Sequence, residues 1–177
     1  GQVISQCGAV AEMSSLLQGG CGGSCHVESR EKREKRLNLL VDMIKMDTTG
    51  GKEAALAEIL VERFAAAGIA GRLEPVEAGR FNVVACLPGR SPGNRLVLNA
   101  HLDTVPVGEG WTKDPFGAEI AGGKLYGRGA SDTKSSLAAM ATVMIEFAQE
   151  GVALEHDLVF LGTAGEEKDM AGARAFV

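Results

Sequence analysis

Apolar and polar positions follow two different periods along the chain, which predicts helices interspersed with strands from residue 29 onward. Leu37, Leu40 and Ile44 recur at helical spacing, and residues 54–67 form a second amphipathic helix. A third helix is expected at about residues 133–149. Strands are expected at residues 72–76, 82–87, 95–100 and 157–163, with a short hairpin formed by residues 118–120 and 124–126. This order predicts an α/β fold in which a mixed sheet is flanked by helices.

A histidine and an aspartate follow the apolar run of residues 96–100. Side chains two apart in an extended segment point the same way, so His101 and Asp103 are expected to share a face. A metal-binding imidazole works best when its second ring nitrogen donates to an oxygen that fixes its orientation. The commoner alternative for such a pair is a strand-end histidine that hydrogen-bonds to a nearby acid.

A second acidic position lies where a glycine-rich turn meets a helix. Asp132 follows Gly127 and Gly129, which indicate backbone conformations or close approaches that larger side chains would forbid. Asp132 could simply cap the helix, because an aspartate at that point accepts from free amide groups of the first turn. The glycines favour a further role.

Two adjacent glutamates, Glu166 and Glu167, follow the strand expected at residues 157–163. Adjacent side chains diverge in extended geometry, so one glutamate could bind a metal while its neighbour takes a proton from the water that the metal activates. Taken alone, the pair could be a solvated acidic turn. Because sites in open α/β sheets gather beyond the carboxyl ends of strands, the three clusters together favour a two-metal hydrolase site.

Three segments carry a resemblance to a known family. Residues 100–106 (AHLDTVP), 127–134 (GRGASDTK) and 165–167 (GEE) resemble the signature segments of the zinc-dependent amidohydrolases and exopeptidases. This family includes acetylornithine deacetylase, succinyl-diaminopimelate desuccinylase, aminoacylase and carboxypeptidase G. The resemblance extends from about residue 30 to the end of the chain, and residues 111–116 and 123–129 fit the connection between the first two segments.

The resemblance implies a role for each site residue. His101 would bind one zinc ion, Glu167 would bind the other, and Asp132 would bridge both. Glu166 would be the general base, and Asp103 would orient His101. The resemblance also implies a cis peptide bond between Asp132 and Thr133, and Co²⁺ as a possible substitute for zinc.

The chain departs from the family pattern beyond residue 167. The family uses two further metal ligands, an acidic residue and a late histidine, together with an inserted lid and dimerisation domain, and none of these is found here. The other histidines are His26 and His156, and His156 is expected on the surface at the far end of the sheet. We therefore expect residues 29–177 to be the amino-terminal portion of a catalytic domain, inactive by itself, whose parent is a homodimer.

Composition and charge limit the classes of protein to which the chain could belong. The chain has 177 residues, 45% of them hydrophobic, and a formal net charge of -5, so it can form an apolar core but gives no reason to expect nucleic-acid binding. Residues 30–36 are rich in Lys and Arg, but interleaved glutamates indicate a solvated helix face. No apolar stretch approaches the length of a membrane span.

The first 28 residues do not fit the α/β pattern, and we expect a flexible, glycine-containing lead-in. Residues 1–5 match an N-myristoylation signal if an initiator methionine was removed, and Cys7 could then be a second anchor. Cys21, Cys25 and His26 could bind a metal or form a disulfide. Without a secretory signal peptide, four cysteines favour a reducing cytoplasm.

Two functional classes follow from the sequence. The first is a zinc-dependent hydrolase of amide bonds in N-acyl amino acids or small peptides. The second is a non-catalytic fragment or partner-binding module that retains the scaffold. The sequence does not specify the acyl group or the amino acid.

Overall fold

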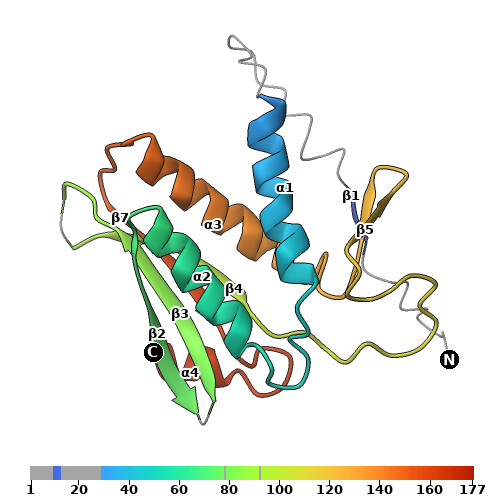
Figure 1. Ribbon diagram of the computed structural model, residues 1–177. Coiled ribbons are helices and arrows are strands. Elements are labelled where there is room, and N and C mark those ends of the chain that lie inside the picture. Colours follow the sequence, from blue (N-terminus) through green and yellow to red (C-terminus); the bar gives the residue numbers. More distant parts are fainter. Residues whose placement is uncertain (1–9, 13–28, 78, 92) are drawn as a thin grey trace, which may run out of the picture.

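The computed structural model describes residues 10–12, 29–77, 79–91 and 93–177. This part of the chain contains both helices and strands (Figure 1). Their order is β1 (Val10–Glu12), α1 (Arg30–Ile44), α2 (Ala54–Ala66), β2 (Ala70–Glu77), β3 (Arg80–Leu87), β4 (Arg95–His101), β5 (Glu119–Ala121), β6 (Lys124–Tyr126), α3 (Lys134–Gln149), β7 (Asp157–Thr163) and α4 (Ala171–Phe176).

The larger sheet has four strands in the order β2-β3-β7-β4. β3 pairs antiparallel with both β2 and β7, whereas β4 pairs parallel with β7. The sheet is therefore mixed, as the sequence predicts. His101 pairs with Thr163, so the carboxyl ends of β4 and β7 coincide and the segments that follow them start side by side.

The main hydrophobic core lies between this sheet and the helices. Val83 and Ala85 of β3 belong to it, as do Phe64 of α2 and Phe160 of β7, whose rings meet edge to face with centroids 5.0 Å apart. Such an aromatic pair contributes roughly 0.5–1.5 kcal/mol beyond the burial of its surface. The core thus fixes β3 and β7, the two central strands, against α2.

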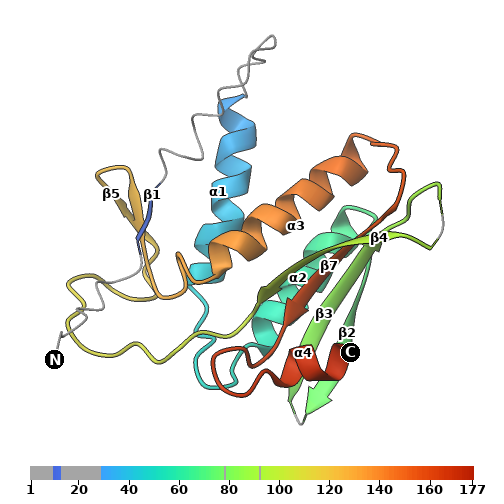
Figure 2. The same cartoon turned by 180° about the vertical axis from the view of Figure 1, so that it is seen from behind.

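The opposite face of the sheet carries a smaller apolar cluster. Val84, Val159 and Leu161 form it, with Cys86 packed against it. Figure 2 shows α4 on this face and α2 on the other. Along β3 the side chains alternate between the two faces, so Arg80, Asn82 and Val84 point toward the α4 side.

A second, three-stranded sheet has the order β1-β6-β5. The expected hairpin supplies β5 and β6, and Val10–Glu12 adds a third strand by pairing antiparallel with β6. This strand was not predicted; an unpaired hairpin edge offers ladder hydrogen bonds to any extended segment, whatever its side chains. The remaining features of the lead-in, residues 1–5, Cys7, Cys21, Cys25 and His26, lie outside the described residues.

The observed elements agree closely with those predicted, and each expected helix and strand is present. Among the described residues, none of the helices is both long enough and apolar enough to cross a bilayer. Besides β1, the helix α4 was not predicted; it has six residues and one buried residue, Gly172, and hence no apolar stripe to reveal it.

Candidate metal centre

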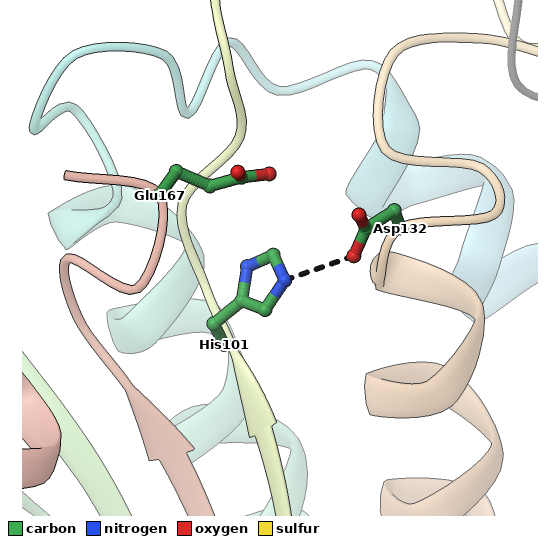
Figure 3. Close-up of side chains that lie close together, drawn as sticks. All are labelled: His101, Asp132 and Glu167. Carbon is green, nitrogen blue, oxygen red and sulfur yellow. Dashed lines mark hydrogen bonds and ion pairs between the residues drawn. The ribbon is translucent and has the colours of Figure 1, made fainter. Parts of the chain in front are cut away.

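The last residue of β4 lies at the middle of an acidic cluster. The imidazole of His101 points between the carboxylates of Asp132 and Glu167 (Figure 3), and its Nε2 lies 3.0 Å from Oδ1 of Asp132. The potential ligand atoms of these three residues all lie within 4.8 Å of one another. One imidazole nitrogen and carboxylate oxygens at this spacing form a donor set that suits a divalent ion such as zinc.

Asp103 contacts His101 through its main chain. Nδ1 of His101 lies 2.9 Å from the carbonyl oxygen of Asp103, and 3.7 Å from its carboxylate. An Nδ1–H that donates to this carbonyl leaves the Nε2 lone pair free for a metal. The carboxylate of Asp103 instead accepts from the main-chain amides of Glu166 and Glu167, at 3.0 and 3.1 Å.

Burial and neighbouring carboxylates shift the pKa values of two of these groups. Burial lowers the pKa of His101, but its hydrogen bonds to Asp103 and Asp132 and the negative charge of both residues outweigh burial, so the pKa is raised. The pKa of Glu167 is also raised, first by burial and then by the surrounding carboxylates, against the opposing effect of His101. A divalent cation would relieve this repulsion and would compete with protons for both side chains.

The turn that carries Asp132 is tightly packed. The peptide bond between Asp132 and Thr133 is cis, as the family resemblance implies. A Cβ atom at Gly127 would lie 2.2 Å from the side chain of Ile44, and one at Gly129 would lie 2.8 Å from that of Thr104. These are the close approaches that the glycines predict.

Asp132 itself is not a helix cap. The residue at the N-cap of α3 is Thr133, which makes no side-chain capping hydrogen bond. The carboxylate of Asp132 is 75% exposed and turned toward His101. Its observed position therefore does not support the capping alternative.

Lys134 anchors the start of α3 and was not singled out from the sequence. Its side chain is fully buried, and Nζ donates to the carbonyl oxygen of Met46 at 2.7 Å. Burial lowers the pKa of Lys134 to about 8, against the attraction of Asp47. This contact joins the turn that carries Asp132 to the connection between α1 and α2.

Glu166 borders a polar cavity beside the cluster. Its side chain is 44% exposed, and Oε2 lies 3.8 Å from Nε2 of His101. The cavity has a volume of about 380 Å³, and its lining includes hydroxyl groups of Thr133, Ser136 and Thr163. Glu166 therefore faces open space in which a small molecule can approach His101 and Asp132, which also line the cavity.

His156 and Cys86, two other potential metal-binding residues, lie away from the cluster around His101. His156 is exposed just before β7, at the opposite end of that strand from His101, as expected. Cys86 is half-buried in β3, and burial together with the charge of Asp157 raises the pKa of its thiol. Neither residue contributes to the cluster.

Residues 97–177 match the model of a family described as Peptidase family M20/M25/M40. A probable succinyl-diaminopimelate desuccinylase from Staphylococcus aureus is 33% identical over 143 residues, 80% of this chain and 35% of that protein. Acetylornithine deacetylase from Proteus mirabilis is 38% identical over 131 residues, 72% of this chain and 33% of that protein. The chain thus spans about a third of the length of these curated relatives.

The fold is also found among solved structures. An M20 family metallo-carboxypeptidase from Sulfolobus solfataricus superimposes with a TM-score of 0.64 at 25% sequence identity. The match covers 72% of this chain and 30% of that one. The mixed sheet with its flanking helices therefore matches part of the fold of this M20 family enzyme.

Proposed function

We propose that this chain, which belongs to Peptidase family M20/M25/M40 through residues 97–177, supplies part of the metal centre of an enzyme that hydrolyses amide bonds. The observation that carries the proposal is the convergence of His101, Asp132 and Glu167 at one end of the sheet, with their ligand atoms within 4.8 Å of one another. The three residues come from three segments far apart in the sequence, and each is the residue that the family resemblance predicts.

We assign a role to each side chain. His101 would hold one zinc ion, Glu167 would hold a second, and Asp132, the most exposed of the three, would be shared by both. When bound, zinc would polarise the scissile carbonyl and activate the attacking water. Co²⁺ is the substitute we expect because it accepts the same nitrogen and oxygen donors.

Glu166 is the general base in this proposal. Its carboxylate is not among the three clustered ligands, yet it faces the cavity beside them. It would take a proton from the attacking water and deliver that proton to the nitrogen of the leaving amine. Asp103 keeps Glu166 and Glu167 in place through their main-chain amides and holds the ring of His101 through its carbonyl oxygen.

The substrate class that we propose rests on the names of the relatives. The desuccinylase, the deacetylase and the metallo-carboxypeptidase are named for removing an acyl group or a terminal amino acid. We propose N-acyl amino acids or small peptides as substrates for the enzyme to which this chain belongs. A homodimeric parent and a cytoplasmic location remain predictions from the family resemblance and from cysteine usage.

The number of ligands bears on the activity of the chain by itself. Catalytic zinc ions have about three protein ligands each, and the cluster offers one imidazole and two carboxylates for two ions. We therefore propose weak metal binding and no appreciable hydrolysis by this chain alone, with full activity where further residues complete the ligand set.

The deciding experiment replaces each of the two adjacent glutamates singly by glutamine. It uses the longer protein in which further residues complete the metal ligand set. Glu166→Gln should abolish hydrolysis of N-succinyl and N-acetyl amino acids, with a fall in kcat of at least about 100-fold, while metal content stays unchanged. Glu167→Gln should lower both metal content and activity. Metal analysis and turnover on the same preparations test this, and the opposite pattern would exchange the two roles.

A further inference from the structure

The segment that carries the two glutamates is a loop closed at its base. The chain leaves β7 at Thr163, and the loop returns when the amide of Gly172 donates to the carbonyl oxygen of Ala164 at 2.8 Å. Between these points lie Glu166 and Glu167. Within this loop the amides of Asp169 and Met170 both donate to the carbonyl oxygen of Gly165, which gives it a compact turn.

One side chain of the neighbouring strand bridges the base of this loop. Asn82 of β3 is 1% exposed, and both the nitrogen and the oxygen of its carboxamide make hydrogen bonds. Nδ2 donates to the carbonyl oxygen of Gly172 at 2.8 Å, and Oδ1 accepts from the amide of Ala164 at 3.0 Å. The side chain thus holds the outgoing and returning ends of the loop together.

The base of the loop is tightly packed around Asn82. A Cβ atom at Gly172 would lie 2.3 Å from Oδ1 of Asn82 and 2.5 Å from the nitrogen of Ala164. Two residues earlier on the same face of β3, Arg80 lies under the turn, because a Cβ atom at Gly165 would be 2.6 Å from its Nη2. Arg80 is fixed in turn by Glu53, whose Oε1 accepts from Nε at 2.7 Å.

We propose that Asn82 is a positioning residue for the metal centre: by bridging Ala164 and Gly172 it sets the orientation in which Glu166 and Glu167 face His101. The carboxylate of Asp103 holds the tip of the same loop through the amides of Glu166 and Glu167. The loop is therefore fixed at its base from β3 and at its tip from the end of β4. This inference rests on the proposed roles of Glu166 and Glu167 at the metal.

Two variants break the bridge from opposite sides. Asn82→Asp keeps the shape of the side chain and the acceptor for Ala164, but it replaces the donor to Gly172 by a carboxylate oxygen that repels the carbonyl. Gly172→Ala leaves β3 unchanged, and alanine has a higher helix propensity than glycine. The added Cβ atom would nevertheless displace Asn82. Val84→Ala is the matched control, because Val84 is buried on the same face of the same strand and belongs to the separate apolar cluster with Val159 and Leu161.

The test uses two measurements on the 177-residue chain. Hydrogen exchange of the Glu166 and Glu167 amides, followed by NMR without metal, reports whether the loop is held. Co²⁺ titration, followed by visible absorption, reports the geometry and affinity of the centre. Asn82→Asp and Gly172→Ala should speed exchange of both amides about tenfold and weaken Co²⁺ binding about 10-fold or more, as for other groups that orient ligands.

The two measurements separate this inference from the proposed function. Val84→Ala should leave both readouts within about twofold of the parent chain. This substitution weakens the apolar cluster but does not open the loop locally. Exchange at Glu166 and Glu167 that is unprotected in the parent, or unchanged in both bridge variants, would overturn the positioning role. A parent chain that binds no Co²⁺ would contradict the proposed function instead, and exchange would still decide the role of Asn82.

Discussion

Asp103 makes contacts that its position in the sequence predicts only in part. The spacing of His101 and Asp103 predicts that they share a face, and the structure brings them into contact, but through the main-chain carbonyl oxygen of Asp103. The carboxylate instead accepts from the amides of Glu166 and Glu167, at 3.0 and 3.1 Å. Spacing in the sequence could not reveal this pairing, since the two segments are more than 60 residues apart.

Gly165 is a second position at which the loop is sensitive to a small change. Its φ of +76° favours glycine, and a Cβ atom there would approach Nη2 of Arg80 to 2.6 Å and Oδ1 of Asp169 to 2.9 Å. Gly165→Ala should therefore lower the free energy of unfolding by about 2–3 kcal/mol, from backbone strain and from displaced neighbours. Urea denaturation measures this loss.

Gly151 provides the control for that substitution. It also has a positive φ, of +64°, but nothing lies within 4 Å of the position of its Cβ atom. Gly151→Ala should cost only the backbone contribution, about 1 kcal/mol. Equal losses for the two variants would mean that the contacts of Gly165 with Arg80 and Asp169 do not matter.

At the scale of elements, the sequence predicts the helices and strands well and their connections poorly. Apolar periodicity locates the four strands of the main sheet and α1, α2 and α3, because each buries one face. Asn82 and Arg80 escaped notice because they stand at the beginning of a strand whose remaining residues are apolar, where a polar residue is usually read as a strand end. Their partners, Glu53, Ala164 and Gly172, belong to other elements, and no local pattern connects them.

The connection between α1 and α2 offers a pH-dependent test at this scale. Asp47 accepts from Nζ of Lys52 at 2.6 Å and from the hydroxyl and amide of Thr49. These contacts, led by the hydrogen bond from Lys52, lower the pKa of Asp47 from 3.8 to about 2. A carboxylate with a lowered pKa stabilises the fold fully above about pH 4, and this contribution is lost as the pH falls toward 2.

Asp47→Asn should therefore be less stable than the parent at pH 7, and the difference should shrink between about pH 4 and pH 2. Thermal unfolding at a series of pH values measures it. Lys52→Met removes the ion pair but keeps the Thr49 contacts, so its effect should be smaller. A difference between parent and Asp47→Asn that stays constant down to pH 2 would show that the carboxylate makes no such contribution.

At the scale of the whole molecule, the sheet brings the three signature segments together. β4 and β7 are parallel neighbours that end at the same level, and α3 runs back across the sheet from the turn that holds Asp132. Candidate residues were found from the sequence because their types and spacing match a specific chemistry. What the sequence could not supply was the set of distances, because these depend on how α3 and the loop after β7 pack against the end of β4.

In the proposed metal centre, His101, Asp132 and Glu167 bind a divalent metal and Glu166 does not. Co²⁺ titration of the 177-residue chain, followed by visible absorption and checked by calorimetry, tests it most directly. We expect measurable but weak binding, with a dissociation constant raised at least about tenfold by His101→Ala, Asp132→Asn or Glu167→Gln and no such change for Glu166→Gln. Equal affinity in the parent and the three ligand variants, or a loss confined to Glu166→Gln, would contradict it.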